Sequence, residues 1–383
     1  MANIKGGKRL PKGENLLDNN TKFTYIRVAD FQDNGTINLQ NIKFINENTY
    51  NVLKNYKIYD DNLYISIAGT IGKSGIIPKE LNGAILTENA VKLEYIQNNI
   101  SNKFMYFFTL SNIFKTQIQT STKIVAQPKL AITRLKQIQI PLPPLKEQER
   151  IVGILDESFA KIDESIKILE QNLLNLDELM QSALQKAFNP LKDNAKENYK
   201  LPQSWEWKSL EEISENISAG GDKPKNCTES KTAKNQIPVY ANGVNNNGLV
   251  GYTDKATIIK PSLTISARGT IGFVCIRKEP YFPIVRLISL IPCENILCLH
   301  YLYFCLNFFI AKGEGSSIPQ LTIPKFKSLQ IPLPPLKEQE QIAKHLDFVF
   351  EKTKALKELY TKELKDYEEL KQSLLNKAFK GEL

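Results

Sequence analysis

The chain has 383 residues, which is enough for two or more domains with hydrophobic cores of their own. Hydrophobic residues make up 42% and charged residues 24%, as in an ordinary globular protein. No run approaches the roughly 18 uninterrupted apolar residues of a membrane span. The N-terminal residues lack the apolar stretch of a signal peptide. We therefore expect a cytoplasmic protein without a membrane segment.

The net charge of +9 is unevenly distributed. Residues 1–140 carry 18 Lys and Arg against 10 Asp and Glu, and residues 191–331 carry 17 against 12. Residues 145–190 carry only 5 against 9, and residues 336–383 carry 10 against 10. Two basic regions separated by neutral or acidic ones favour two contacts with a polyanion, and nucleic acid comes first. A basic face that is only solvated surface stays open as the alternative.

Residues 1–140 contain short strand-like runs broken by Gly, Asn and Pro. The runs Leu63–Ile67 and Ala84–Leu86 predict strands, as does the alternating run Leu135–Ile140. The apolar run Phe104–Leu110 favours a helix that continues to Phe114. This mixture of elements predicts the α+β class.

An eleven-residue motif then occurs twice. The segment Gln139–Glu149 is repeated identically at Gln330–Glu340, 191 residues later. Each copy is followed by apolar residues at steps of three and four, which predicts long helices over 145–188 and 336–379. Forty-four residues of helix span roughly 66 Å. Both helices end in Lys-Ala-Phe, and two such rods most simply pair as an antiparallel coiled coil.

A polar linker at 189–203 precedes a second globular region. This region repeats features of the first, since Ala267-Arg-Gly-Thr-Ile-Gly272 resembles Ala68-Gly-Thr-Ile-Gly72. The sequence therefore predicts two α+β globular domains that alternate with two long helices. We assign residues 1–140 to the first globular domain, 141–190 to the first helical spacer, 191–331 to the second globular domain and 332–383 to the second spacer.

The motifs of common catalytic sites are missing from the sequence. Gly69-Thr-Ile-Gly72-Lys73-Ser74 is not a phosphate-binding loop, because the glycine required five residues before Gly72 is Ile67. A tight backbone turn is the better interpretation. The two histidines offer little material for a metal cluster or a triad, because His345 lies on the second predicted long helix and His300 in an apolar run, and the five cysteines include no Cys-x-x-Cys pair. We therefore expect no catalytic residues, no metal site and no cofactor in this chain.

The twin Ile-Pro-Leu-Pro-Pro-Leu-Lys-Glu-Gln-Glu motifs, the Lys-Ala-Phe helix ends and the paired Gly-Thr-Ile-Gly turns resemble the specificity subunit of type I restriction–modification systems. The resemblance covers essentially the whole chain. It implies that the globular regions are target-recognition domains, each of which reads one half of a bipartite site in double-stranded DNA. The helices would then set the spacing between the half-sites.

The resemblance also implies a non-catalytic subunit that recruits partners. These are two modification subunits, which bring S-adenosylmethionine and methylate adenine, and restriction subunits in the full complex. Glu147 and Glu338 near the helix starts are candidates for the docking surface of the modification subunits. The remaining site residues are candidates for DNA contacts through phosphates or base edges, and they are Lys8, Arg9, Lys73, Lys123, Lys129, Lys223, Lys225, Arg268, Ser316, Ser317 and Gln320.

One departure concerns the start of the first domain. The second domain has Trp205–Ile213 before its Ile217–Gly221 segment, whereas the matching Ile4 stands only three residues after Met1. We therefore expect a first domain with a truncated N-terminus that is incomplete at one sheet edge, unless Lys380–Leu383 covers that edge.

Two other functions compete with DNA recognition. A coiled-coil scaffold that binds two protein partners without DNA is the main alternative, and a salt-dependent affinity for DNA would argue against it. An enzyme with an unrecognised site, such as a fused methyltransferase, would have to bind S-adenosylmethionine by itself.

Overall fold

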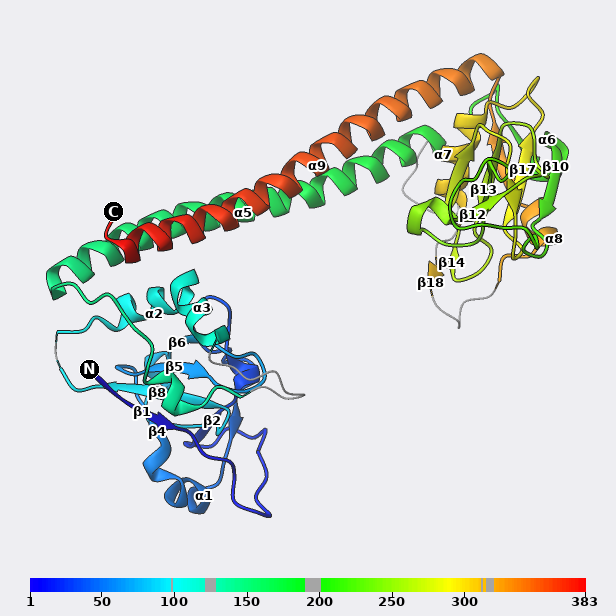
Figure 1. Cartoon of the computed structure of the whole chain (residues 1–383). Helices are drawn as coiled ribbons and strands as arrows, with labels where there is room; N and C mark the ends of the chain where they lie inside the picture. Colours follow the sequence, from blue (N-terminus) through cyan, green and yellow to red (C-terminus); the bar gives the residue numbers. More distant parts are fainter. Residues whose placement is uncertain (98, 121–128, 190–200, 311–312, 315–319) are drawn as a thin grey trace. The chain divides into compact units, whose positions relative to one another are not determined.

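The computed structural model describes residues 1–97, 99–120, 129–189, 201–310, 313–314 and 320–383. It divides into two compact units, of which the first comprises Met1–Leu169 with Lys362–Leu383 and the second comprises Glu170–Thr361. Each unit contains one globular domain and parts of both long helices (Figure 1). Within the described ranges, no helix is long and apolar enough to span a membrane.

The first globular domain is built on two four-stranded sheets. One is antiparallel and has the order β1 (Ala2–Gly6), β8 (Ala90–Tyr95), β5 (Leu63–Ser66), β6 (Ser74–Ile76). The other is mixed and has the order β3 (Lys43–Phe44), β2 (Thr24–Ile26), β7 (Ala84–Leu86), β4 (Lys57–Ile58). The helices of this domain are α1 (Glu47–Val52), α2 (Asn102–Leu110), α3 (Asn112–Thr120) and α4 (Ile132–Leu135).

The second globular domain repeats the first sheet. Its antiparallel sheet has the order β10 (Ser214–Ala219), β17 (Ile288–Pro292), β13 (Ser262–Ile265), β15 (Val274–Arg277). Smaller sheets pair β12 (Leu249–Thr253), β11 (Ile237–Tyr240) and β16 (Phe282–Pro283), then β14 (Thr270–Ile271) with β18 (Gly313–Glu314), and β19 (Gln330–Leu333) with β9 (Glu206–Ser209). Its helices are α6 (Leu210–Ile213), α7 (Leu299–Phe309) and α8 (Ile323–Lys327). The predicted α+β class is therefore confirmed for both domains.

Two local predictions in the first domain are wrong. The helix expected to continue from Phe104 to Phe114 breaks at Ser111, whose hydroxyl donates to the Phe108 carbonyl at 2.7 Å and accepts from the Phe114 N–H at 3.3 Å. The strand expected over Leu135–Ile140 is absent from the described structure, where α4 ends at Leu135 and the following residues form neither helix nor strand.

The equivalent segment of the second domain does form a strand. This strand, β19, contains Pro332. Pro332 is tolerated because β19 pairs with one strand only, β9, so its missing N–H faces no second partner.

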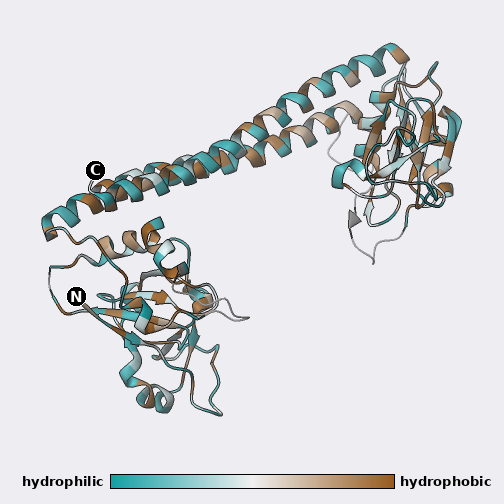
Figure 2. Ribbon diagram, viewed as in Figure 1, coloured by the Kyte–Doolittle hydropathy of each residue, from teal (hydrophilic) through white to brown (hydrophobic). Residues whose placement is uncertain are grey.

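The long helices are α5 (Leu145–Phe188) and α9 (Leu336–Lys380). In the first unit the N-terminal half of α5 packs on the C-terminal end of α9, with Leu155 and Leu375 in one core cluster and Asp163 bonded to Lys371 at 2.5 Å. In the second unit the C-terminal half of α5 packs on the N-terminal half of α9, where Asp177 pairs with Lys357. Hydrophobic residues recur along both helices (Figure 2). The predicted antiparallel pairing is confirmed within each unit.

Candidate nucleic-acid interface

The repeated motif attaches each helix to the globular domain that precedes it. Gln148 in the first copy and Gln339 in the second are both fully buried. The Gln148 side chain accepts from the Ser101 N–H at 2.9 Å and donates to the carbonyls of Asn99 and Pro143 at 3.0 and 2.8 Å. One buried amide thus satisfies three backbone groups of the joint.

Gln339 makes the same three bonds in the second unit. It accepts from the Cys298 N–H at 2.9 Å and donates to the carbonyls of Ile296 and Pro334 at 2.9 and 2.8 Å. The glutamine of the motif is therefore a structural residue, and its geometry explains why this part of the sequence is the same in both halves.

The far end of each long helix packs into the domain of the other half. Phe379 of α9 contacts Phe104 and Phe108 in the first domain, with ring centroids 5.1 and 5.3 Å apart. Phe188 of α5 contacts Tyr301 and Phe308 in the second domain, at 5.5 and 5.6 Å. Each domain is thus held by the start of the helix that follows it and by the end of the other helix, which fixes how it presents its loops.

The Gly-Thr-Ile-Gly segments form the same tight turn in both domains. Gly69, Gly72, Gly269 and Gly272 all have φ between 71° and 88°. The Gly72 N–H donates to the Ser66 carbonyl at 2.9 Å, and the Gly272 N–H donates to the Ser266 carbonyl at 3.0 Å. Left-handed backbone at both glycines favours residues without a Cβ. The interpretation as a backbone turn is confirmed.

Predicted site residues of the first domain gather around this turn. The Lys8 N–H donates to the Leu86 carbonyl at 2.9 Å, and the Ala68 N–H donates to the Asn89 carbonyl at 3.3 Å. The segment 86–90 therefore lies between the chain at Lys8 and the turn. Lys129 is bridged to Ala68. We call the surface formed by Lys8, Arg9, Glu88, Lys73 and Lys129 the first loop surface.

Two of the basic residues on the first loop surface have acidic partners. Lys73 lies 2.8 Å from Asp33, and Arg9 lies 2.7 Å from Glu88. The hydrogen bond to Glu88 raises the pKa of Arg9. Partial burial opposes ionisation of Glu88, but hydrogen bonds from Arg9, its own N–H and Thr87 outweigh it and lower the pKa of Glu88. Lys8 and Lys129 are exposed to solvent.

The second domain builds the equivalent surface from four segments. The Val285 N–H donates to the Gly221 carbonyl at 2.8 Å, which ties the segment 284–287 to the chain leading to Lys223 and Lys225. Asn242 donates to the Val285 carbonyl at 2.6 Å and accepts from the Ala267 N–H at 2.8 Å. Arg268, which follows Ala267, therefore lies beside the segment 284–287 and the chain leading to Lys223 and Lys225.

Gln320 joins this cluster through its neighbour in the chain, because the Leu321 N–H donates to the Ala267 carbonyl at 3.2 Å. We call the surface formed by Lys223, Lys225, Arg268, Arg286 and Gln320 the second loop surface. It contains predicted DNA-contact residues from separate parts of the sequence, together with Arg286, which the sequence did not single out.

The segment that carries Arg286 is strained. Val285 and Arg286 have φ of 54° and 60°, and the Val285 side chain is 50% exposed. Left-handed backbone costs a β-branched residue about 1–3 kcal/mol, and such strain concentrates at functional sites. The hydrogen bonds to Gly220, Gly221 and Asn242 hold the segment in this conformation.

An asparagine-rich loop next to it is also fixed. Asn246 and Asn247 have φ of 48° and 51°. Arg277, which is 8% exposed, donates to the Asn247 carbonyl at 2.5 Å and stacks 3.5 Å from the centre of the Tyr240 ring. The run Asn245–Gly248 is a turn signal in the sequence. Arg286 has no such signal, because only the sheet topology brings it to this surface.

The remaining predicted residues divide into two groups. Lys123, Ser316 and Ser317 lie outside the described residues. Glu147 is partly exposed on α5 and bonded to Arg150 at 2.7 Å. Glu338 is half-buried and accepts from the Trp205 indole at 3.1 Å, so it also has a structural role.

Comparison with known proteins identifies the family. The sequence profile described as "Type I restriction modification DNA specificity domain" matches residues 1–174 and 202–366. A Mycoplasma pneumoniae protein named "Putative type I specificity subunit S.MpnORF507P" is 29% identical over 353 residues, covering 91% of this chain and 86% of that protein. The Escherichia coli EcoBI specificity subunit is 31% identical over 164 residues, which cover 43% of this chain and 34% of that protein.

Solved structures agree on the fold. One, from a study of complex assembly and conformational transition of the type I restriction–modification system, has a TM-score of 0.77 at 21% identity and covers 94% of this chain and 92% of its own. The specificity (HsdS) subunit from Thermoanaerobacter tengcongensis has a TM-score of 0.60 at 20% identity, covering 94% and 91%. Since the profile matches most of both halves, the chain belongs to the family of type I restriction–modification DNA specificity subunits.

Proposed function

We propose that the first and second loop surfaces each read one half of a bipartite DNA site. The single observation that carries this proposal is the equivalence of the two surfaces. Both contain the same glycine turn and an equivalent segment, which is 86–90 in the first domain and 284–287 in the second. The side chains of these segments differ, with Glu88 in the first where the second has Val285. Equal scaffolds with different side chains suit two different half-sites.

The second loop surface has the chemistry of base readout. Arg268 and Arg286 are exposed, and the lysine and arginine salt bridges described in this domain involve other residues, namely Lys208, Lys234, Lys260 and Lys327. An unpaired guanidinium can donate two hydrogen bonds to guanine in the major groove. Because the strained segment at Val285 is already fixed, little ordering cost remains on binding.

The antiparallel helices would set the distance between the half-sites and offer docking sites for two modification subunits. Glu147 at the start of α5 is one of the two predicted docking residues, and its side chain is 40% exposed. In this proposal the chain is non-catalytic and acts in the cytoplasm. Methyl transfer from S-adenosylmethionine takes place on the modification subunits, and DNA cleavage takes place on restriction subunits.

Co-expression with the modification subunits tests the half-site assignment. Arg286→Ala and Arg268→Ala should each relax recognition at one half-site only, by roughly 5- to 150-fold per lost bidentate contact. Lys260→Ala is the matched control, because Lys260 is a basic residue of the same domain bonded to Glu215 at 2.6 Å. Genome-wide mapping of methylated adenines gives the result. Unchanged methylation in both arginine variants would contradict the assignment, and methylation independent of this chain would favour the protein-scaffold alternative.

A second experiment tests the spacer. One heptad inserted after Glu170 and another after Thr361 would lengthen both helices by roughly 10 Å, which is about three base pairs of DNA. The gap in the recognised sequence should grow by that amount while both half-sites stay the same. A changed half-site with an unchanged gap would overturn the spacer role.

A further inference from the structure

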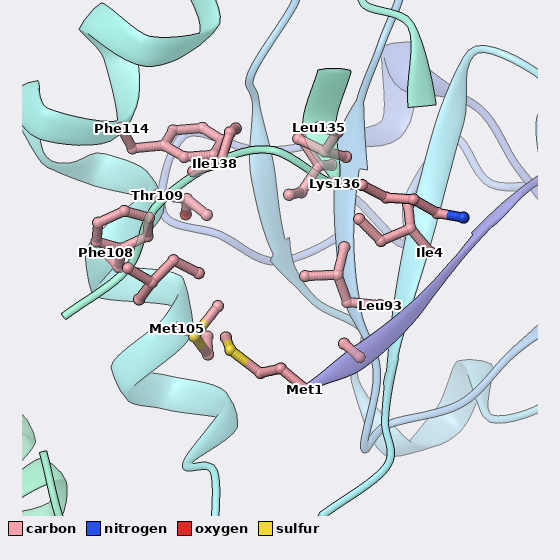
Figure 3. A pocket seen from close by; sticks show the side chains of 13 residues that line it. Met1, Ile4, Leu93, Met105, Phe108, Thr109, Phe114, Leu135, Lys136 and Ile138 are labelled. Carbon is pink, nitrogen blue, oxygen red and sulfur yellow. The ribbon is translucent and has the colours of Figure 1, made fainter. Parts of the chain in front are cut away.

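The first domain contains an apolar cavity outside its loop surface. The cavity has a volume of about 220 Å³, lies between β1, α2 and the segment after α4, and is surrounded in Figure 3 by side chains that include Met1, Met105, Phe108, Leu135 and Ile138. Thr109, one of the two polar residues of the lining, already donates to the Tyr106 carbonyl at 2.5 Å. Lys136 is the other, and its amine points away from the two methionines in Figure 3. Neither polar side chain is available to orient a ligand, so we assign the cavity no binding role.

The second domain presents a different feature, a polar loop at the end of a hairpin. This loop joins β11 to β12, and its tip comprises Val244, Asn245, Asn246 and Asn247, all of which are exposed. The hydrogen bonds that the loop makes with described residues come from its backbone and from the Asn242 side chain. The three carboxamides of Asn245–Asn247 thus have donors and acceptors that the described chain does not use.

The backbone of this loop is ordered. The Ala241 N–H donates to the Gly248 carbonyl at 2.8 Å and closes the loop. The Gly243 N–H donates to the Ser266 hydroxyl at 3.2 Å. Two residues of the tip have left-handed backbone, and asparagine adopts this conformation more readily than other residues with a Cβ. The loop therefore has a defined shape before any ligand binds, which lowers the ordering cost of binding.

A buried arginine supports the tip. Arg277 on β15 is 8% exposed, and the described salt bridges of this domain do not include it. Its guanidinium donates to the Asn247 carbonyl at 2.5 Å and to the Thr264 hydroxyl at 3.0 Å, and it lies 3.5 Å from the centre of the Tyr240 ring. A buried charge without a counter-charge costs free energy. The contacts of Arg277 are therefore better explained by positioning of the tip than by stability, because a charge-assisted hydrogen bond fixes direction as well as distance.

The tip lies beside the second loop surface. The Asn242 side chain, at the start of the loop, donates to the Val285 carbonyl and accepts from the Ala267 N–H. The residues that follow these two in the chain are Arg286 and Arg268, and both are exposed. A guanidinium matches the two acceptors of guanine in the major groove, whereas the carboxamide of asparagine matches the donor and acceptor of adenine. The tip thus adds adenine chemistry to a surface whose arginines suit guanine.

We propose that Asn246 and Asn247 read an adenine·thymine pair in the half-site of the second domain, and that Arg277 is the positioning residue that holds them. This inference rests on the proposed reading of a half-site by the second loop surface, and it extends that proposal to a named base and to residues outside that surface.

Replacement of the two tip residues tests the base assignment in the complex with the modification subunits. Asn246→Gly together with Asn247→Gly removes both carboxamides, and glycine keeps the left-handed backbone without strain. Asn246→Asp with Asn247→Asp leaves only acceptors, which suit the amino group of cytosine. Asn216→Asp is the matched control, because Asn216 is an exposed asparagine of β10 in the same domain.

The half-site is first defined by genome-wide mapping of methylated adenines. Duplexes in which each base pair is changed in turn then compete for the complex at fixed salt, since salt alters all affinities. The glycine variant should lose preference for adenine at one position of the second half-site by roughly 5- to 150-fold. The aspartate variant should prefer cytosine there, and the control should match the unaltered chain.

Arg277→Gln tests the positioning role. It should relax the same base pair as the glycine variant while the preferences at the other base pairs stay within about twofold, because only the tip depends on this guanidinium. Equal weakening at every base pair of the half-site, or no change at any, would show that Arg277 does not position the tip.

Failure of this inference differs from failure of the proposed function. If the glycine variant keeps every base preference while Arg268→Ala or Arg286→Ala relaxes one, the tip does not read DNA although the second loop surface does. Relaxation at a guanine·cytosine pair, or in the first half-site, would also overturn the adenine assignment. If the glycine variant and both arginine variants all leave recognition unchanged, the proposed reading by the second loop surface is itself wrong.

Discussion

Replacing Gln339 by leucine should selectively weaken the second unit. The leucine has a similar volume but can neither accept from the Cys298 N–H nor donate to the carbonyls of Ile296 and Pro334. Gln339 is fully buried, so water cannot take over these groups without opening the joint. A lost hydrogen bond costs about 1 kcal/mol, and a buried donor left without a partner costs about 1–3 kcal/mol. We therefore expect a loss of about 3 kcal/mol in the free energy of unfolding.

Tryptophan fluorescence during urea denaturation is a suitable assay. The chain has only two tryptophans. Both lie in or next to β9 of the second unit, and Trp205 is bonded to Glu338, the residue before Gln339. The fluorescence signal therefore reports unfolding of the second unit and of its joint with α9.

Gln341→Leu is the matched control, because Gln341 is exposed on the same helix two residues further on. It should change the free energy of unfolding by no more than about 0.5 kcal/mol. If Gln339→Leu also stays within about 0.5 kcal/mol of the unaltered chain, the buried amide does not hold the joint and the explanation of the repeated motif is wrong.

Three further predictions concern stability. Phe188→Ala should cost about 3–5 kcal/mol in the fluorescence assay, because this fully buried ring packs on Tyr301 and Phe308; a midpoint unchanged from the parent chain would refute the packing role of the helix end. Reversing one charge of the pair Asp177–Lys357, by Lys357→Glu, should cost about 0.5 kcal/mol at low salt, since both side chains are partly exposed; Asp177→Lys in the same chain should restore it, and failure to recover would exclude a direct pair. Burial raises the pKa of Tyr25 to about 12 from 10.0, so the folded state holds this proton more tightly than the unfolded state. The resulting contribution to stability is complete below pH 10 and is lost as the pH rises from 10 through about 12. Tyr25→Phe should make this loss of stability less steep in thermal melts followed by circular dichroism. An equally steep loss in the variant would show that another group causes it.

The long helices and their pairing were predictable from the sequence. Apolar residues at steps of three and four over more than forty residues leave one face that must be buried, and the other rod of the chain is the nearest partner. The helix limits Leu145–Phe188 follow from local chemistry, with prolines before the start and a polar linker after the end. The glycine turns were likewise predictable, because left-handed backbone restricts the residue type.

Short elements were less predictable. Leu135–Ile140 alternates like a strand, but a strand needs a partner. Gln330–Leu333 pairs with β9, whereas no described strand pairs with its counterpart in the first domain. The break at Ser111 depends on a single hydroxyl that competes for backbone groups. A strand partner far away in the chain decides the first segment, whereas a side chain within the segment itself decides the second.

The sequence by itself determined the twofold plan of this protein: two basic globular domains, two rods and one repeated joint. Periodicity, charge and identity between the copies are properties of the chain alone. Only the tertiary structure brought Arg286 to the same surface as Arg268 and Lys223, showed that Gln148 and Gln339 satisfy buried backbone groups, and revealed the apolar cavity beside Met1. The physical reason is that loop surfaces, buried hydrogen bonds and cavities arise from contacts between residues far apart in the sequence, which no local pattern records.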